Sequence, residues 1–338
     1  MKLTKIFICS ICVLILACQE EPYDIPHGVP SVVKIYNNYA YTTNGEFGLD
    51  IIDLNTLKTV NKMPPAREMN SIDNLSITDN LLFAIDARGE DFLAVFSLDN
   101  PTSPKLVSGP VPVQGAPFTG VSAANGNVVV SGGTTFMNFR KYDANGKLSD
   151  TEGRFGRDRG HPDILLSEDG RVAYASTDFN GQVNGARFGM IALELDGLTN
   201  SPRLISEIGI PGAGFTAGTT RPAGFPIQSA LADDHLLVAY GEGLAIIELV
   251  NGRGLASLNT LDLGLAAISI SVFNGVAYVI GNEPTPTLVK IDISDIENPV
   301  IIESISLNTN GGIPTSIDVN NQYILIAANE GGLIVMNN

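Results

Sequence analysis

The stretch Ala267–Leu307 reads AISISVFNGVAYVIGNEPTPTLVKIDISDIENPVIIESISL, and it contains one complete structural repeat. Apolar residues alternate over Ile268–Val272 and recur over Val276–Ile280, as they do in half-buried strands. Between the two runs lies Asn274-Gly275, which suits a two-residue hairpin turn because both residues tolerate positive φ. The sequence therefore predicts a pair of antiparallel strands here.

The same stretch predicts two further strands. Residues 282–286 are rich in turn formers, Leu288–Ile293 is a third apolar run, and Asn298-Pro299 leads into a fourth over Val300–Leu307. Four short antiparallel strands in about forty residues are the composition of one β-propeller blade.

Seven copies of this pattern follow one another along the chain. Each copy has a polar turn before its second strand, and that strand carries an apolar or aromatic residue at a matching place. These residues are Tyr41, Phe83, Val130, Tyr174, Leu237, Tyr278 and Ile324. A β-solenoid is the alternative, but its repeats are usually shorter. We therefore predict an all-β, seven-bladed β-propeller of four-stranded antiparallel blades over residues 31–338.

The third strands share a recurrent phrase. It occurs at Gly48–Leu54, Phe92–Leu98, Leu288–Ser294 and Gly332–Met336, and twice it is followed by Asn-Pro. This phrase resembles the repeat of the LVIVD-repeat family of bacterial surface and secreted proteins. The resemblance covers about residues 31 to 338 and is clear in copies one, two, six and seven. It implies a propeller and brings no common catalytic residues.

Two expectations concern the repeat aspartates and the third-strand core. We interpret Asp53 and Asp292 as residues that cap turns, because the repeat motif is architectural. The apolar third-strand positions are expected to be buried between neighbouring blades. They are Ile51, Val95, Ile291 and Val335.

Ring closure is less well defined by the sequence. Copy seven ends after its third strand, at Asn338. Tyr23–Val29 is the only candidate for the missing fourth strand, and the prolines of this region make it a poor one. Imperfect closure, or closure by packing alone, are the alternatives.

The N-terminus predicts export and lipidation. Lys2 and Lys5 precede the apolar run Ile6–Leu16, which is too short for a membrane-spanning helix and is typical of a signal peptide over residues 1–17. The ending Ile-Leu-Ala-Cys18 resembles the lipobox of bacterial lipoproteins, whose cysteine is acylated after cleavage. Ordinary cleavage beside an incidental cysteine is the alternative.

Residues 18–30 are expected to connect the lipidated Cys18 to the propeller. Cys9, Cys12 and Cys18 are the only cysteines, so the mature domain has none available for a disulfide. Residues 19–21, Gln-Glu-Glu, resemble an acidic tag for display on the outer face of the outer membrane, with a solvated acidic tether as the alternative. The expected location is the cell envelope, as an outer-membrane lipoprotein.

Composition limits the partners. Without Lys2 and Lys5, the chain keeps 18 basic residues against 36 acidic ones, a formal charge of −18. This charge argues against nucleic acid or anionic lipid as a general partner. Trp is absent, which weakens the case for a glycan ligand because Trp is the strongest stacking platform for sugars.

No catalytic or cofactor motif stands out. His27, His161 and His235 lie in separate blades or linkers, without zinc-ligand spacing. The sequence contains no nucleophile elbow and no phosphate loop, and paired carboxylates such as Glu90-Asp91 fall in loops. We therefore expect no cofactor, no metal and no identified catalytic residue.

Arginines and long insertions point to one rim of the propeller. The insertions 153–162, 177–189 and 211–226 are all assigned to the same face, where binding loops are most often found. The candidate ligand-binding residues are Arg154, Arg157, Arg159, His161, Asp178, Arg187, Phe215, Arg221 and Phe225. The alternative is that the arginines pair with Asp150, Glu152, Asp158 and Asp163 and only hold long loops in place.

Two functions are compatible with these features. The first is a non-enzymatic binding or scaffold protein, anchored to the bilayer through Cys18, that holds a protein, peptide or glycan on this rim. The second is an extracellular hydrolase or lyase that acts on a polymer with loop carboxylates. We favour the first, because no set of nucleophile, base and orienting group is visible.

Overall fold

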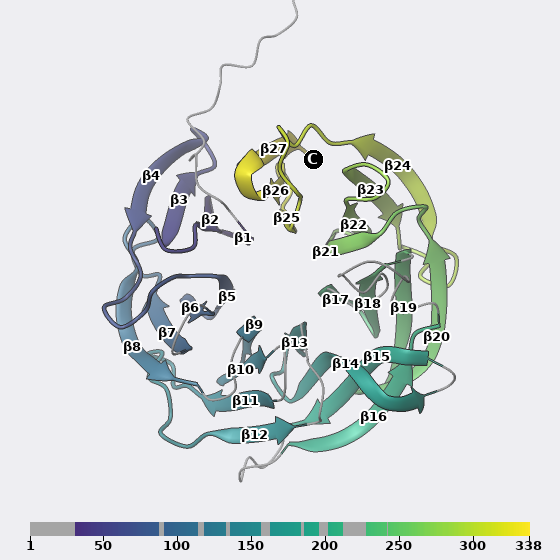
Figure 1. Cartoon of the computed structure of the whole chain (residues 1–338), viewed down its shortest axis with the longest axis horizontal. Helices are drawn as coiled ribbons and strands as arrows, with labels where there is room; N and C mark the ends of the chain where they lie inside the picture. The colour runs from purple at the N-terminus through teal and green to yellow at the C-terminus, as the bar shows by residue number, and fades with distance from the viewer. Residues whose placement is uncertain are drawn as a thin grey trace, which may run out of the picture.

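The computed structural model describes residues 31–87, 91–113, 118–132, 136–156, 163–183, 186–195, 202–211, 228–241 and 243–338. Within these ranges the chain forms seven antiparallel sheets arranged as blades around a central axis (Figure 1). A single turn of 3-10 helix, η1 (Asn329–Gly331), is the one helical element in the described part. The predicted all-β, seven-bladed propeller is confirmed.

Each blade is built in chain order, from the axis outward. The first strands, next to the axis, are β1 (Val33–Tyr36), β5 (Asn74–Thr78), β9 (Phe118–Ala124), β13 (Ile164–Leu166), β17 (Gln228–Ala232), β21 (Ala267–Phe273) and β25 (Ser316–Val319). The second strands are β2 (Tyr39–Thr43), β6 (Leu81–Asp86), β10 (Asn127–Gly132), β14 (Val172–Val183), β18 (His235–Tyr240), β22 (Val276–Gly281) and β26 (Tyr323–Ala327).

The outer half of each blade follows the same order. The third strands are β3 (Leu49–Asp53), β7 (Phe92–Ser97), β11 (Phe136–Lys141), β15 (Ala186–Glu194), β19 (Gly243–Val250), β23 (Thr287–Asp292) and β27 (Leu333–Asn337). The fourth strands are β4 (Lys58–Met63), β8 (Lys105–Pro112), β12 (Gly153–Gly156), β16 (Arg203–Gly209), β20 (Gly254–Asp262) and β24 (Val300–Ser306). Blade seven has three strands among the described residues, and the other six blades have four.

The turn residues adopt the backbone geometry that their sequence predicts. Asn274 and Gly275 have φ of 49° and 73°, and Asn125 and Gly126 have 42° and 78°. Both pairs connect a first strand to a second strand. Positive φ at both central residues gives these hairpins the twist of the strands that they join.

The predicted roles of the repeat aspartates are also confirmed. Asp53 Oδ1 accepts a hydrogen bond from the Asn55 N–H at 2.8 Å, and Asp292 Oδ1 accepts one from the Ser294 N–H at 2.9 Å. The bonds to Ser294 lower the pKa of Asp292, because they favour the charged carboxylate. Both side chains stabilise the turn that follows their strand.

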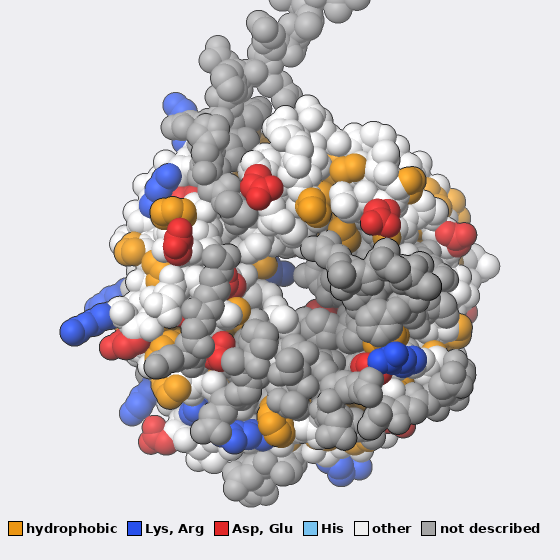
Figure 2. All heavy atoms as spheres, viewed as in Figure 1, with side chains coloured by type: hydrophobic (Ala, Val, Ile, Leu, Met, Phe, Trp, Pro, Cys, Tyr) orange, Lys and Arg blue, Asp and Glu red, His pale blue; other side chains and the backbone are white. Residues whose placement is uncertain are grey.

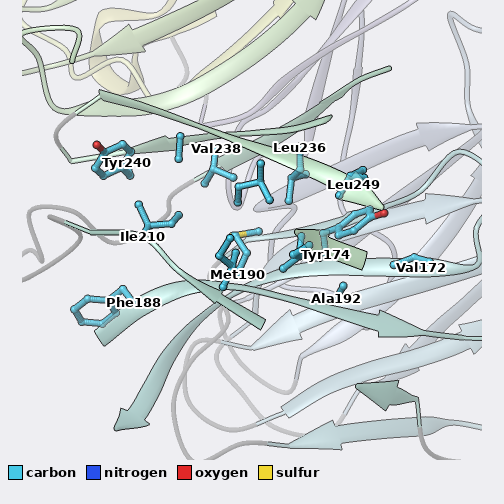
Figure 3. Close-up of a cluster of buried hydrophobic side chains, with 14 residues drawn as sticks. Val172, Tyr174, Phe188, Met190, Ala192, Ile210, Leu236, Val238, Tyr240 and Leu249 are labelled. Atoms are coloured by element: carbon cyan, nitrogen blue, oxygen red, sulfur yellow. The ribbon is translucent and has the colours of Figure 1, made fainter. Parts of the chain in front are cut away.

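The hydrophobic core is divided among the contacts between blades. One cluster of buried side chains lies in each of the seven interfaces, and the cluster between blades four and five is the largest. There Tyr174, Met190 and Ala192 of blade four face Leu236 and Val238 of blade five (Figure 3). Blades are therefore held together largely by non-local apolar packing, since the backbone strand ladders pair only within each sheet.

The third-strand prediction is correct in three of four places. Ile51, Val95 and Ile291 have no exposed surface. Val335 of β27 is only half-buried, because no fourth strand covers β27 within the described residues.

The ring closes between blades seven and one. Val33 and Ala40 of blade one pack with Leu325 and Ala327 of blade seven. The Val33 N–H also donates to Ser316 Oγ at 3.3 Å. Packing and hydrogen bonding of the inner strands thus join the two ends of the propeller, while the segment 23–29 lies outside the described residues.

Two of the three expected insertions differ from the prediction. Residues 177–189 continue β14 and β15 into a long hairpin, in which Thr177 pairs with Gly189 and Asp178 with Phe188. Residues 153–156 form β12, where Arg154 pairs with Asn138. Alternating apolar and polar residues favour strand in both segments, and neighbouring strands were available to pair with them. The third insertion, 211–226, lies outside the described residues apart from Pro211.

Candidate functional site

Hydroxyl groups on the inner strands connect neighbouring blades at four of the seven junctions. In four places a serine accepts a hydrogen bond from a backbone N–H on the first strand of the following blade. The pairs are Ser76 with Ala123 (3.2 Å), Ser122 with Leu166 (2.9 Å), Ser269 with Ile317 (3.1 Å) and Ser316 with Val33 (3.3 Å). Each bond satisfies an inner-edge N–H that would otherwise lack a partner near the axis. The wall of the central channel is therefore polar and fixed.

A cavity of about 390 Å³ occupies the axis of the ring. Its lining comes from all seven blades and combines hydroxyl, amide and charged groups with a few apolar side chains. The polar members include Ser31, Lys34, Asp73, Asn74, Asp163, Gln228 and Ser229. Figure 2 shows an opening at the centre of the ring on the face that it presents. A concave site with convergent polar groups is where small ligands most often bind.

Asp163 has the most perturbed carboxyl group on this wall. It precedes β13, accepts a hydrogen bond from Ser229 Oγ of blade five at 2.5 Å, and donates its N–H to Ser176 Oγ at 3.0 Å. Burial raises the pKa of Asp163 to about 7, although the bond from Ser229 and the charge of Lys34 act in the opposite direction. The side chain therefore changes charge near neutral pH.

A second group of carboxylates lies in blade two. Ser71 Oγ is 2.5 Å from Asp73 Oδ2 and 2.8 Å from Asp86 Oδ1, and the Asn70 N–H donates to Asp86 Oδ2 at 2.6 Å. Burial and then the nearby Asp86 raise the pKa of Asp91. Asp86 and Asp91 are 0% and 4% exposed. A substrate could not reach Asp86 or Asp91, and we interpret Asp86 as a structural support for residues 70–71. Asp73 also lines the axial cavity.

Two of the predicted site residues contact each other. Asp178 of β14 and Arg187 of β15 form a bidentate ion pair. Arg187 Nε lies 3.0 Å from Asp178 Oδ1, and Arg187 Nη2 lies 2.9 Å from Asp178 Oδ2. The pair raises the pKa of Arg187, and its guanidinium lies 5.1 Å from the centre of the Phe188 ring. Arg187 is 44% exposed, so this fixed cation remains accessible on the long hairpin.

Arg154 lies elsewhere than expected. It belongs to β12, the outermost strand of blade three, and not to a rim loop. Its Nε is 3.3 Å from Glu152 Oε1, and Glu152 also pairs with Arg140 at 3.0 Å. For Arg154 the predicted alternative, pairing with Glu152, is therefore correct.

The remaining candidates belong to other parts of the chain. Arg157, Arg159, His161, Phe215, Arg221 and Phe225 lie outside the described residues, as does Cys18. Within the described ranges, no three histidine, cysteine, aspartate or glutamate side chains are grouped as a metal site would require. No helix in those ranges is long and apolar enough to cross a membrane.

The axial cavity is a feature that sequence reasoning missed. From sequence, Asp163 is expected only as a partner for arginines, and no prediction covers Lys34, Gln228 or Ser229. A signal was available, because a serine recurs in the first strand of most copies. A hydroxyl at a strand position that faces the axis has no hydrophobic role, which marks it as a wall residue.

Comparisons with known proteins describe the fold more than the function. No family model matches the sequence, and no curated protein sequence matches it. Among solved structures, a putative 6-phosphogluconolactonase from Bacteroides uniformis is similar, with a TM-score of 0.64 and 14% identity over 92% of this chain and 90% of that chain. The computationally designed Ika8 protein is similar too, with a TM-score of 0.58 and 10% identity over 93% and 98% of the two chains. These likenesses establish the fold alone.

Proposed function

We propose that this protein is a non-enzymatic binding protein of the cell envelope, anchored through an acylated Cys18, that holds a polar ligand at the channel. The ligand class is a carbohydrate or peptide that carries an anionic group. The observation that carries the proposal is the accessible Arg187, fixed by Asp178 on a hairpin of a ring whose axis holds a polar cavity.

Geometry favours binding on two grounds. A guanidinium held by a bidentate pair loses little side-chain entropy when it meets an anion, and it has five donors in a fixed arrangement. The channel wall adds hydroxyl and amide groups whose positions are set by hydrogen bonds between blades. Preorganised polar groups of this kind give a ligand orientation and specificity.

Charge supports a local site for an anion. The chain is strongly acidic, with a formal charge of −16 before any processing. Asp178 offsets much of the charge of Arg187, so the pair is expected to bind small or locally anionic ligands and to disfavour a polyanion such as nucleic acid.

The enzymatic alternative rests on two carboxyl groups with raised pKa values, Asp91 of blade two and Asp163 on the channel wall. Raised pKa values are typical of catalytic acids, and Asp91 has one. Asp91 is only 4% exposed, which argues against its acting on a substrate, whereas Asp163 lines the channel. Similarity to a putative 6-phosphogluconolactonase suggests one direct assay, the hydrolysis of 6-phosphogluconolactone. Turnover that Asp91→Asn abolishes in a folded protein would favour this alternative.

Anchoring is tested by fractionation. Cys18→Ala should release the protein from the membrane fraction, whereas Cys12→Ala, a change within the predicted signal peptide, should leave it there. Equal membrane association of Cys18→Ala and the parent protein would exclude the lipoprotein assignment.

Ligand binding is tested on arrays of acidic glycans and envelope peptides. The triple variant Arg157→Ala, Arg159→Ala and Arg187→Ala should lose retention while it stays folded. Arg203→Ala is the matched control, because Arg203 is exposed on the outer strand β16 and is paired with Glu194. Unchanged retention of the triple variant, or loss of stability without loss of binding, would contradict the proposed site.

A further inference from the structure

Hydroxyl groups on the wall of the axial cavity have donors that the protein does not use. Ser76, Ser122 and Ser316 line the cavity, and the oxygen of each accepts a backbone N–H from the next blade. A hydroxyl group that accepts in this way still has its own O–H to donate. Among the described residues, none of these three O–H groups has an acceptor. They are therefore available to a ligand in the cavity.

Gln228 adds an amide donor with a fixed orientation. Its Oε1 accepts hydrogen bonds from the Ser269 hydroxyl and from the Ile270 N–H, the latter at 3.3 Å. The opposite orientation would place an amide N–H against the Ile270 N–H, so Nε2 is the end that points away from these two residues. Gln228 lines the cavity, and its Nε2 forms no hydrogen bond within the described part of the chain. Its N–H groups are available as well.

Lys34 places a positive charge on the same wall. It lies on β1, the inner strand of blade one, and its side chain is half-buried. In the described ranges its ammonium group forms no ion pair and no hydrogen bond. Its charge nevertheless acts on Asp163 in the direction that lowers the pKa of that carboxyl group, so the two groups lie near each other without pairing. The ammonium group is therefore accessible to an anion in the cavity.

The charge of the wall favours a ligand with a single negative charge. Lys34, Asp73 and Asp163 are the ionisable residues that line the cavity. Asp73 Oδ2 accepts hydrogen bonds from Ser71 Oγ and from the Ala87 N–H, which hold its carboxylate in blade two. Burial raises the pKa of Asp163 to about 7, so at mildly acidic pH this side chain is neutral and has an O–H to donate. Lys34 and the unused donors then attract one anionic group, whereas Asp73 disfavours a group with two or three negative charges.

We propose that the axial cavity binds the carboxylate of a small organic acid, with Lys34 as its counter-ion and with the unused donors of Gln228 and the three serines around it. These donors come from the inner strands β1, β5, β9, β17 and β25, which surround the axis (Figure 1). A volume of about 390 Å³ is in the range of small-molecule sites, so the ligand is a small acid and not a polymer chain. The inference rests on the proposed function for its location at the channel, and it adds the chemical class of the group that the cavity takes.

Asp163 makes this binding dependent on pH. In its protonated form the side chain donates to the carboxylate of the ligand, and in its ionised form it repels that carboxylate. The apparent affinity is reduced by the fraction of protein in the competent form, so with a pKa of about 7 it falls about tenfold between pH 6 and pH 8. The cavity therefore takes up the acid at mildly acidic pH and releases it above neutrality.

Calorimetric titration with D-glucuronate and with lactate tests the assignment at pH 6. Full-length Cys18→Ala protein is used, so that anchoring does not affect the result. D-Glucose is the neutral probe that matches glucuronate in size, and it should bind about tenfold more weakly or not at all, because it has no charge for Lys34 to pair with.

A matched pair of lysine variants identifies the counter-ion. Lys34→Gln should weaken glucuronate binding about tenfold or more. Lys58→Gln removes the same charge from an exposed position on the outer strand β4 of the same blade and should leave the affinity unchanged. Absence of binding by both acids at pH 6, equal affinities for glucuronate and glucose, or equal affinities of the two lysine variants would overturn the proposal.

Asp163→Asn provides a second test that does not depend on Lys34. This variant should bind glucuronate at pH 8 as tightly as at pH 6, because position 163 then gains no charge. A fall in affinity as large as that of the parent protein would overturn the assignment to this cavity. The titrations keep every arginine in place, so failure of the arginine variants on the ligand arrays would remove the rim contact of the proposed function and leave these measurements intact.

Discussion

Replacing Asp163 with Asn should change how the stability of the protein depends on pH. The Asp163 carboxyl lies on the wall of the axial cavity, and its surroundings raise its pKa from 3.8 to about 7. Between these two pH values the folded protein keeps a proton that the unfolded chain has released. The free energy of unfolding therefore falls as pH rises through this window, and the loss is complete above pH 7.

The magnitude follows from the shift. Each unit of pKa corresponds to about 1.4 kcal/mol, so the full shift can change the free energy of unfolding by at most about 4 kcal/mol. Asp163 is only partly buried and lines the axial cavity, so solvent screening should reduce this effect, and part of the window lies below pH 5. Between pH 5 and pH 8, we expect the Asp163 carboxyl to lower the free energy of unfolding of the parent protein by about 1 to 2 kcal/mol. The asparagine side chain in Asp163→Asn has no charge to gain, and its amide oxygen can still accept the hydrogen bond from Ser229.

Urea denaturation followed by far-ultraviolet circular dichroism suits this test, because the chain has no Trp for fluorescence. Relative to the parent protein, Asp163→Asn should gain stability steadily from pH 5 to pH 8. Asp292→Asn is the control, since the pKa of Asp292 is lowered and the side chain stays charged throughout that range. Parallel stability curves for Asp163→Asn and the parent would show that Asp163 does not titrate near pH 7 in the folded protein and would refute the reasoning.

Three further substitutions test the fold. Val95→Asp places a charge at a site with no exposed surface and should cost about 3 to 5 kcal/mol, so an unchanged melting temperature would contradict the strand register. Ser122→Ala leaves the Leu166 N–H without its 2.9 Å partner and should cost about 1 to 2 kcal/mol in urea denaturation, whereas a neutral result would mean that water replaces the hydroxyl. Gly48→Ala should lower the free energy of unfolding by about 2 kcal/mol or more, because Gly48 has φ of 87° and a Cβ there would lie 2.0 Å from the Met63 carbonyl oxygen. An unchanged melting temperature of Gly48→Ala in calorimetry would contradict this backbone geometry.

The repeat itself determined the architecture of the propeller. Alternation of apolar residues and turn dipeptides such as Asn274-Gly275 are local properties, and they specify hairpins wherever they occur. Seven such units fix the number of blades, because one sheet cannot bury both of its faces alone and must pack against neighbours. Ile51 and Val95 could be assigned to the core for the same reason.

Features that depend on contacts between distant parts of the chain required the tertiary structure. The pair of Asp163 and Ser229 joins residues 66 positions apart in sequence, and the raised pKa of Asp163 results from the ring that encloses it. Arg187 is a candidate from its residue type alone, but its bidentate pair with Asp178 depends on the register of a hairpin that the sequence alone presents as a loop. Local patterns are encoded along the chain, whereas cavities, ion pairs and burial arise only where folding brings separate strands together.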